Sequence, residues 1–457
     1  MDSPHLSEKE PLRSAFNRLP RGSASHSHIH SHYLLFWSMA TPHNRLPPSF
    51  STRRLSPLLL LVTMVALPAY LLASSAVPFL GPLTPRNTVI RSRQPDSEPG
   101  TDPNDPFGSV LGPVISTNFP DPAIIWVDGV SYAFSTNNRG VGSEMIHVQM
   151  ATSTDNETWT LLDRDAMPQV GAWESGARVW APDVIQLVSR AVEGALDDTG
   201  AHLIQDDGTF VLYYADELVR APAHHCVGVA TSKSVMGPYV PRDTPFACPD
   251  VHTLGGAIDP DGFRDPASGK RYVTYKVDGN SIGHGGTCNN MVPPIVPTPI
   301  MLQEVGEDGI TLVGDAIQIL DRDARDGPLI EAPSLHRSDE GIYFLFFSSN
   351  CFTTPLYDTS YATATNIQGP YTKAGRPLIV TSDGPDLVGP GGLDIIPGGE
   401  MVLFHGHMTV NNDPARKQQV EDASKKSGKP VQDIHLPLVR GMYSGVATFR
   451  GTTVSLA

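Results

Sequence analysis

Five acidic residues at long, similar spacings could together carry out acid–base chemistry. They are Asp121, Asp183, Asp259, Glu331 and Asp394, separated by 62, 76, 72 and 63 residues. Carboxylates gathered in one site raise one another's pKa values by like-charge repulsion. Glycoside hydrolysis uses such a difference, because one carboxyl group donates a proton to the leaving oxygen while an ionised one activates water or attacks carbon. The pattern indicates this chemistry if the fold gathers the acids, although a single Asp-Pro or Ala-Pro pair is also an ordinary turn signal.

The acids begin repeats of one supersecondary pattern. Around each acid lie an apolar run, a glycine-containing turn and an alternating aromatic run, as in residues 121–135. Such a pattern predicts a β-hairpin. Residues 226–232 and 360–364, each followed by Gly-Pro-Tyr, are typical of a third strand that leads to a fourth. The unit is therefore a four-stranded sheet.

Five such units predict an all-β fold, a five-bladed β-propeller over residues 114–457. The first strand of each propeller blade lines the central axis, so the five acids would converge there. A β-sandwich is the alternative, but sandwiches space their strands without a period near 70 residues. Trp180, three residues before the second acid, is the aromatic residue best placed to pack on a sugar face. The charged segment Lys417–Lys429 is expected to be a solvated loop.

The composition excludes some classes of protein. Glycine and proline are frequent, at 41 and 42 residues of 457, and only 18% of residues are charged, which favours turns and strands over long helices. The formal net charge is −15 at pH 7. Nucleic acid is therefore not expected as a partner, because its binding proteins neutralise phosphates with a basic face.

The motifs resemble glycoside hydrolase family 43, a group of five-bladed propellers that includes arabinanases and β-xylosidases. The resemblance covers residues 114–455 and rests on four motifs in the family's order. They are Asp121-Pro122-Ala123, Trp180-Ala181-Pro182-Asp183, Ile258-Asp259-Pro260 and Glu331-Ala332-Pro333.

The resemblance implies a role for each acid. Asp121 would be the general base and Glu331 the general acid, while Asp259 would orient Glu331 and keep it protonated. Asp183 would support the substrate or the structure, with Trp180 as a second substrate-binding residue. The family inverts the configuration of the sugar, so Asp121 would activate a water opposite the leaving group.

One position departs from the family pattern. Many members carry a histidine after Gly-Pro-Gly that can bind a metal or water on the axis, whereas this chain has Gly392. His405 or His407, at the end of the next strand, could replace it, or could be structural. Calcium would be the expected ion if one is bound, because the ligands are oxygens and imidazole. No cofactor is expected to be required.

The expected substrate is an arabinose- or xylose-containing polysaccharide or oligosaccharide, with arabinofuranosidase or arabinanase activity favoured over β-xylosidase activity. A non-catalytic carbohydrate-binding propeller is one alternative, although a lectin needs no catalytic trio. A retaining fructan hydrolase is another, but Ile258-Asp259-Pro260 lacks the Arg-Asp-Pro pattern of those enzymes. We expect a monomer.

The N-terminal region is typical of a targeting segment. Residues 1–54 read as a disordered cytosolic tail or leader, and residues 78–113 as a proline-rich linker. Residues 55–77 are uncharged and long enough for a hydrophobic helix that spans a bilayer, and Arg53 and Arg54 precede them. The segment is either a type II signal anchor or the core of a cleaved signal peptide. Both place the remainder in the secretory pathway, extracellular or membrane-anchored.

All four cysteines lie in the part that would be exported, where disulfides form. Three pairings are open. We favour Cys226–Cys248 with Cys288–Cys351, because each joins segments that are near in the order of the repeats.

Overall fold

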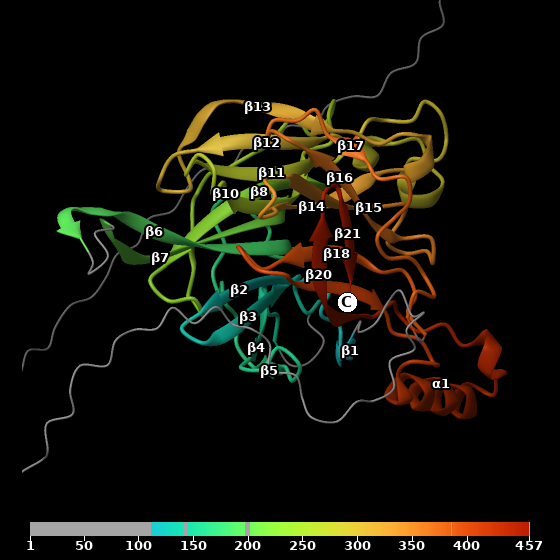
Figure 1. Cartoon of the computed structure of the whole chain (residues 1–457). Helices are drawn as coiled ribbons and strands as arrows, with labels where there is room; N and C mark the ends of the chain where they lie inside the picture. Colours follow the sequence, from blue (N-terminus) through green and yellow to red (C-terminus); the bar gives the residue numbers. More distant parts are fainter. Residues whose placement is uncertain (1–110, 140–143, 197–201, 385, 457) are drawn as a thin grey trace, which may run out of the picture. The chain divides into compact units, whose positions relative to one another are not determined.

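The computed structural model describes residues 111–139, 144–196, 202–384 and 386–456 (Figure 1). Within these ranges the chain forms five antiparallel sheets, which confirms the predicted all-β, five-bladed propeller. The predicted tail, hydrophobic helix and nearly all of the linker lie outside the described residues. Strand β1 begins at Leu111, three residues before the predicted start of the propeller. No helix in the described ranges is long and apolar enough to cross a membrane.

Each of the first four blades is formed by four consecutive strands. Blade one contains β2 (Ala123–Val127), β3 (Val130–Ser135), β4 (Gln149–Ser153) and β5 (Thr160–Leu162). Blade two contains β6 (Trp180–Leu196), β7 (His202–Leu218), β8 (Ala221–Ser232) and β9 (Val240–Pro241). Blade three contains β10 (Ala257–Arg264), β11 (Arg271–Val277), β12 (Ile300–Val305) and β13 (Leu312–Leu320). Blade four contains β14 (Ile330–Arg337), β15 (Tyr343–Ser349), β16 (Asp358–Ala364) and β17 (Thr372–Lys373).

The fifth blade joins the two ends of the propeller. Its strands are β18 (Gly391–Ile395), β19 (Met401–His407), β20 (Arg440–Arg450) and β1 (Leu111–Ile115), with β21 (Thr453–Leu456) also paired to β20. The first strand of the domain thus completes the last sheet by pairing with β20. This closure holds the ring of blades together through backbone hydrogen bonds.

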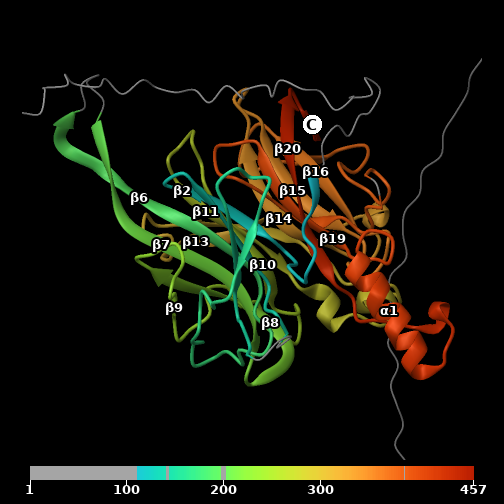
Figure 2. The ribbon, with the colours of Figure 1, turned by 90° about the horizontal axis from the view of Figure 1, so that it is seen from below.

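Short helices lie in the connections between strands. They are the 3-10 turns η1 (Gly279–Ile282), η2 (Thr287–Asn289), η3 (Ala324–Asp326) and η4 (Val431–Asp433), and the α-helix α1 (Pro414–Ser427). Figure 2 shows α1 and the long β6–β7 hairpin extending from opposite sides of the propeller.

Helix α1 corrects the prediction of a loop over Lys417–Lys429. The Asp413 side chain accepts a hydrogen bond from the Ala415 N–H at 2.9 Å, Pro414 occupies the first turn, and Gly428 ends the helix with a left-handed conformation. These are ordinary helix start and stop signals. The helix is polar on nearly all sides, so the sequence shows no apolar stripe that would have revealed it.

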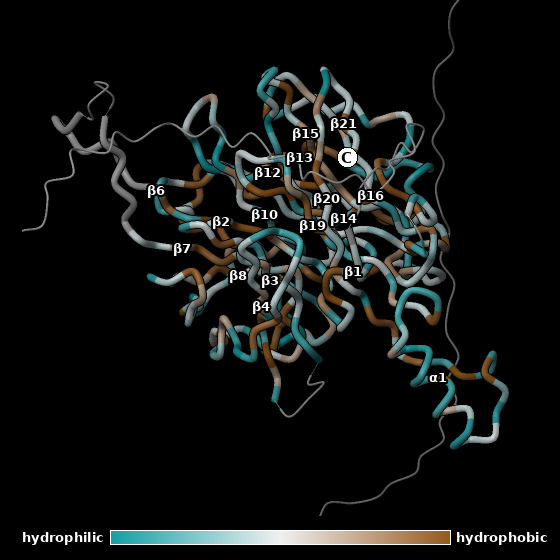
Figure 3. Tube along the Cα trace, turned by 60° about the horizontal axis from the view of Figure 1, so that its bottom comes forward, coloured by the Kyte–Doolittle hydropathy of each residue, from teal (hydrophilic) through white to brown (hydrophobic). Residues whose placement is uncertain are grey.

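The core consists of five apolar clusters, one at each joint between neighbouring blades. Phe134 of blade one and Leu212 of blade two, both fully buried, share the first cluster. Figure 3 shows the apolar residues concentrated along the strands and the hydrophilic ones in the connections. Packing between blades therefore fixes the inner strands, and with them the residues around the axis.

Both predicted disulfides are confirmed. Cys226–Cys248 links the middle of β8 to the connection between blades two and three. Cys288–Cys351 links the β11–β12 connection of blade three to the β15–β16 connection of blade four. The pairing is consistent with an exported protein.

Candidate active site

A bend recurs where each inner strand reaches the axis. One residue of each blade has a positive φ between 42° and 59° there: Asp121, Ala181, Asp259, Ala332 and Gly392. Proline follows in four of the five blades and Leu393 in the fifth. The pairing register shifts at the bend in the four blades where it lies within the inner strand, as expected of a β-bulge.

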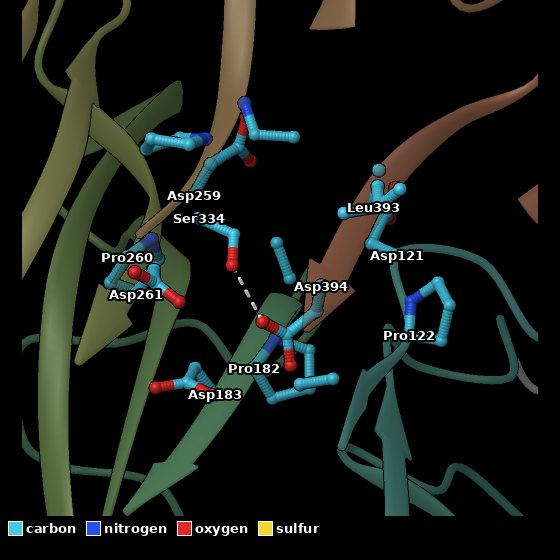
Figure 4. Close-up of a pocket in the computed structure, with 15 residues that line it drawn as sticks. Asp121, Pro122, Pro182, Asp183, Asp259, Pro260, Asp261, Ser334, Leu393 and Asp394 are labelled. Atoms are coloured by element: carbon cyan, nitrogen blue, oxygen red, sulfur yellow. Dashed lines mark hydrogen bonds between the residues drawn. The ribbon is translucent and has the colours of Figure 1, made fainter. Parts of the chain in front are cut away.

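These five bends form the wall of one axial pocket (Figure 4). Each blade contributes the bend residue, the residue after it and the residue two positions after it. The cavity that they enclose is small, with a volume of about 40 Å³. The acids of four blades thus line the axial pocket, as predicted from the repeats. Blade four lines it with Ala332, Pro333 and Ser334, whereas Glu331, directly before this bend, does not line it.

The acids lie on two levels, however, and not in one equivalent register. Asp121 and Asp259 are bend residues, and Glu331 directly precedes one. Asp183 and Asp394 come two residues after a bend, at the position that Asp261 occupies in blade three. Alignment on the bend and its proline, rather than on the acid, would have given the two levels and found Asp261.

Asp121 lies in a strongly cationic, hydrogen-bonded environment. Arg440 Nη1 donates to Oδ1 at 2.8 Å and Nη2 to Oδ2 at 3.3 Å, while Thr136 Oγ1 donates to Oδ2 at 2.7 Å. Burial opposes ionisation, but the charge of Arg440 and the hydrogen bonds from Arg440 and Thr136 hold the pKa of Asp121 below its ordinary value. Asp121 is therefore ionised near neutral pH and can accept a proton from water.

Glu331 lies between a cation and a phenol. Lys276 Nζ is 2.9 Å from its Oε2, and the Tyr357 hydroxyl donates to its Oε1 at 2.9 Å. Asp259 accepts the Ala332 N–H at 2.9 Å, one residue from Glu331. Burial and the neighbouring Glu331 charge raise the pKa of Asp259 to about 8, so Asp259 is protonated at neutral pH. The site thus holds one ionised and one protonated aspartate beside the predicted acid.

The second level of acids connects the blades. Asp183 accepts the Gly262 N–H at 2.8 Å, and Asp261 accepts the Leu335 N–H at 3.1 Å. Asp394 accepts the Ile124 N–H and the Ser334 hydroxyl, both at 2.8 Å, and Figure 4 shows the latter bond. Each of these bonds joins one blade to its neighbour. The structure shows Asp183 in this structural setting, and its contact with substrate stays a prediction.

Trp180 is half-buried at the start of β6. Its ring stacks on His225 with centroids 3.8 Å apart and planes 19° from parallel. His225 is buried, and burial lowers its pKa to about 4, so the stacked imidazole is neutral. A fixed, neutral support suits an aromatic platform for sugar. The role of Trp180 in substrate binding stays a prediction.

His405 and His407 do not line the axial pocket. His405 Nδ1 accepts the Asp121 N–H at 3.1 Å, and Arg440 Nη1 is 3.3 Å from its Nε2. His407 Nε2 is 2.7 Å from the Phe352 carbonyl oxygen. Both ring nitrogens of His405 and Nε2 of His407 face protein groups, so the pair does not fit a calcium site. Among the described residues, no group of three or more His, Cys, Asp or Glu side chains is arranged to hold a metal ion.

The position of His405 nevertheless explains why residue 392 is a glycine. A Cβ atom on Gly392 would lie 2.8 Å from His405 Nδ1, and Gly392 has a φ of +59°. The histidine ring of β19 therefore occupies the space beside the bend of blade five. There its Nδ1 accepts the hydrogen bond from the Asp121 N–H.

Sequence reasoning missed three partners of the acids: Lys276, Tyr357 and Arg440. Lys276 carries a weak signal, because a lysine interrupts the otherwise apolar end of β11 two residues before Asp278. Tyr357 lies in the β15–β16 connection and Arg440 is the first residue of β20. At such positions residue spacing does not predict which way a side chain points.

Comparison with known proteins agrees with this architecture. A thermostable family-43 glycoside hydrolase superposes with a TM-score of 0.54 at 19% identity, over 77% of this chain and 95% of its own. An endo-1,4-beta-xylanase from Bacteroides thetaiotaomicron gives 0.50 at 20% identity, over 76% and 97%. These likenesses show the fold.

Two sequence comparisons are more specific. Beta-D-galactofuranosidase xynD of Aspergillus niger is 24% identical over 363 residues, which are 76% of this chain and 88% of the relative. The profile of "Glycosyl hydrolases family 43" matches residues 110–421, more than half of the chain. The chain therefore belongs to glycosyl hydrolase family 43.

Proposed function

We propose that the protein is an inverting glycosidase in which Asp121 is the general base and Glu331 the general acid. Family membership indicates a glycosidase. The observation that carries the assignment is the contrast between the two sides of the site. Arg440 keeps Asp121 ionised, whereas a protonated Asp259 lies beside Glu331. Hydrolysis by two carboxyl groups requires an ionised base, and Asp121 meets that requirement.

The proposed reaction is a single displacement. Asp121 takes a proton from water, and the water oxygen forms a bond to the anomeric carbon. The bond from that carbon to the glycosidic oxygen breaks, and its electron pair leaves with the oxygen, which takes the proton of Glu331. Tyr357 supports this arrangement, because its hydroxyl contacts Glu331 and its ring stacks on His405, the partner of Asp121.

We favour furanosides as substrates, with α-L-arabinofuranosides first. The relative from Aspergillus niger is named a β-D-galactofuranosidase. α-L-Arabinofuranosyl and β-D-galactofuranosyl groups share the configuration of the ring and differ at the exocyclic carbon, so one pocket can be built for either. β-Xylosides are the second choice.

The test is hydrolysis of nitrophenyl α-L-arabinofuranoside, β-D-galactofuranoside and β-D-xyloside by the full-length protein. We expect the highest kcat/KM with a furanoside. Binding of these sugars without turnover would instead identify a carbohydrate-binding propeller. Proton NMR of the first-formed anomer should show inversion, and retention would contradict the single displacement.

A further inference from the structure

A buried lysine touches the predicted general acid. Lys276 lies on β11, the second strand of blade three, and is fully buried. Its Nζ is 2.9 Å from Glu331 Oε2 and 3.0 Å from Asp278 Oδ1. A buried ammonium is stable only when paired. Although burial opposes its charge, Glu331 and Asp278 raise the pKa of Lys276 above its ordinary value, so the side chain is a fixed cation.

The other groups around Glu331 do not duplicate this charge. The titratable and charged side chains that face Glu331 or its partners come from six elements and connections. They are Asp259 on β10, Lys276 and Asp278 on and after β11, Tyr357 before β16, Asp121 before β2, His225 on β8 and His405 on β19. Burial lowers the pKa values of both histidines, so they are neutral at neutral pH. Lys276 is therefore the cation that contacts the Glu331 carboxylate directly.

We propose that Lys276 is a positioning residue that makes Glu331 a stronger acid and sets the upper pH limit of the reaction, an inference that rests on the proposed function. Negative charge develops on Glu331 as its proton passes to the leaving oxygen. An ammonium fixed 2.9 Å away stabilises the negative charge of the Glu331 carboxylate as its proton leaves.

The same attraction has a second consequence. It favours loss of the Glu331 proton to solvent, so the alkaline limb of the pH profile lies at lower pH than it would without the lysine. Asp278 competes with Glu331 for the ammonium and weakens this effect. Lys276 and its second partner Asp278 thus act on the alkaline limb in opposite directions.

Substitutions of the pair separate a chemical role from a structural one. Lys276→Met removes the cation and leaves Asp278 as an unpaired charge, so the alkaline limb of kcat/KM moves up by about one pH unit or more. Lys276→Arg keeps the charge and stays near wild type. Asp278→Asn leaves the ammonium to Glu331, so the limb moves down.

Leaving-group dependence gives an independent readout. Protonation matters most for a poor leaving group, such as a second sugar. Lys276→Met should therefore reduce kcat for an unactivated oligosaccharide at least about tenfold more than for a dinitrophenyl glycoside, whose departure needs little help from an acid.

The experiment is a pH profile of kcat/KM for the full-length protein and the three variants, measured with the unactivated substrate. Lys270→Met is the control, since Lys270 is an exposed lysine paired with Glu304 next to the same strand. If Lys276→Met does not fold, as judged by circular dichroism, Asp278→Asn still tests the direction of the shift. Opposite shifts in the two variants support the proposal. An active wild type with an unmoved limb in the folded variants overturns it, whereas a wild type that cleaves no glycoside overturns the proposed function.

Discussion

The ionised state of Asp121 depends on residues near the other end of the sequence. Arg440 lies 319 residues later, at the start of β20, and pairs with both carboxylate oxygens of Asp121. His405 accepts the Asp121 N–H from the neighbouring strand β19. The last blade therefore supplies the charge that makes the first acid a base.

Replacing Arg440 should weaken the base in a pH-dependent way. Without the guanidinium the pKa of Asp121 rises, so the acidic limb of the kcat/KM profile should move to higher pH by about 1–3 units in Arg440→Met. A moved limb distinguishes this effect from misfolding, because misfolding lowers kcat/KM over the whole profile without moving its limbs. An acidic limb that coincides with that of wild type would contradict the role of Arg440.

The acids could be predicted from the sequence, whereas their partners could not. Asp121, Asp259 and Glu331 recur one or two residues before a proline in a repeat, and the repeat predicts that they meet. Lys276 and Tyr357 come from a second strand and a connection, and their directions depend on packing between blades. A repeat predicts which elements converge but not which side chains of neighbouring elements touch.

At the scale of the elements, the bend of each inner strand decides how the acids are arranged. The five positive-φ residues carry the chain past the axis, and side chains before and after the bend reach different levels. Hairpins, blade number and strand order followed from turns and periodicity. The two levels did not, because Glu331 and Asp394 occupy different positions relative to the bend although both begin their repeats.

Two disulfides cross-link segments of blades two, three and four. Cys288–Cys351 closes a loop of 63 residues between blades three and four, and Cys226–Cys248 a loop of 22. Chain entropy predicts a loss of about 4 kcal/mol for Cys288→Ser with Cys351→Ser, against about 3 kcal/mol for the other pair. Urea unfolding of the two double variants measures both free energies. A larger loss for the shorter loop would show that strain or local packing outweighs loop length.

For the whole molecule, the second level of acids joins blades two to five and returns to blade one. Burial is the largest cause that raises the pKa of Asp183 to about 8 and that of Asp394 to about 6, and the pKa of Asp261 is raised well above its ordinary value. These acids bind protons in the folded state at a pH where the unfolded chain has released them. The acids that join the blades therefore make the free energy of unfolding depend on pH.

Stability should fall as the pH rises from about 4 to 8. Over this window the folded protein holds more protons than the unfolded chain at these acids, so the free energy of unfolding decreases with pH. Asp261→Asn keeps an acceptor for the Leu335 N–H and removes one charge, so it should flatten the dependence and gain about 1 kcal/mol or more at pH 8 relative to pH 5. Asp422→Asn on the exposed helix α1 is the control. An unchanged slope in Asp261→Asn would show that the axial acids do not govern it.

The propeller is proposed to be delivered through the secretory pathway by residues 55–77. A cleaved signal would leave a mature N-terminus shortly after this segment, whereas a type II anchor would retain it in the membrane fraction. N-terminal sequencing of the protein from membranes and from medium distinguishes the two. An intact N-terminus on protein recovered from the cytosol would contradict both.

The central claim is that Asp121 and Glu331 carry out the hydrolysis as base and acid. The most direct measurement is kcat/KM of Asp121→Asn and Glu331→Gln with an unactivated furanoside, beside the folded wild type. General acid–base catalysis predicts a loss of about 100-fold to 10,000-fold for each variant. Turnover within about tenfold of wild type in either variant would contradict the account.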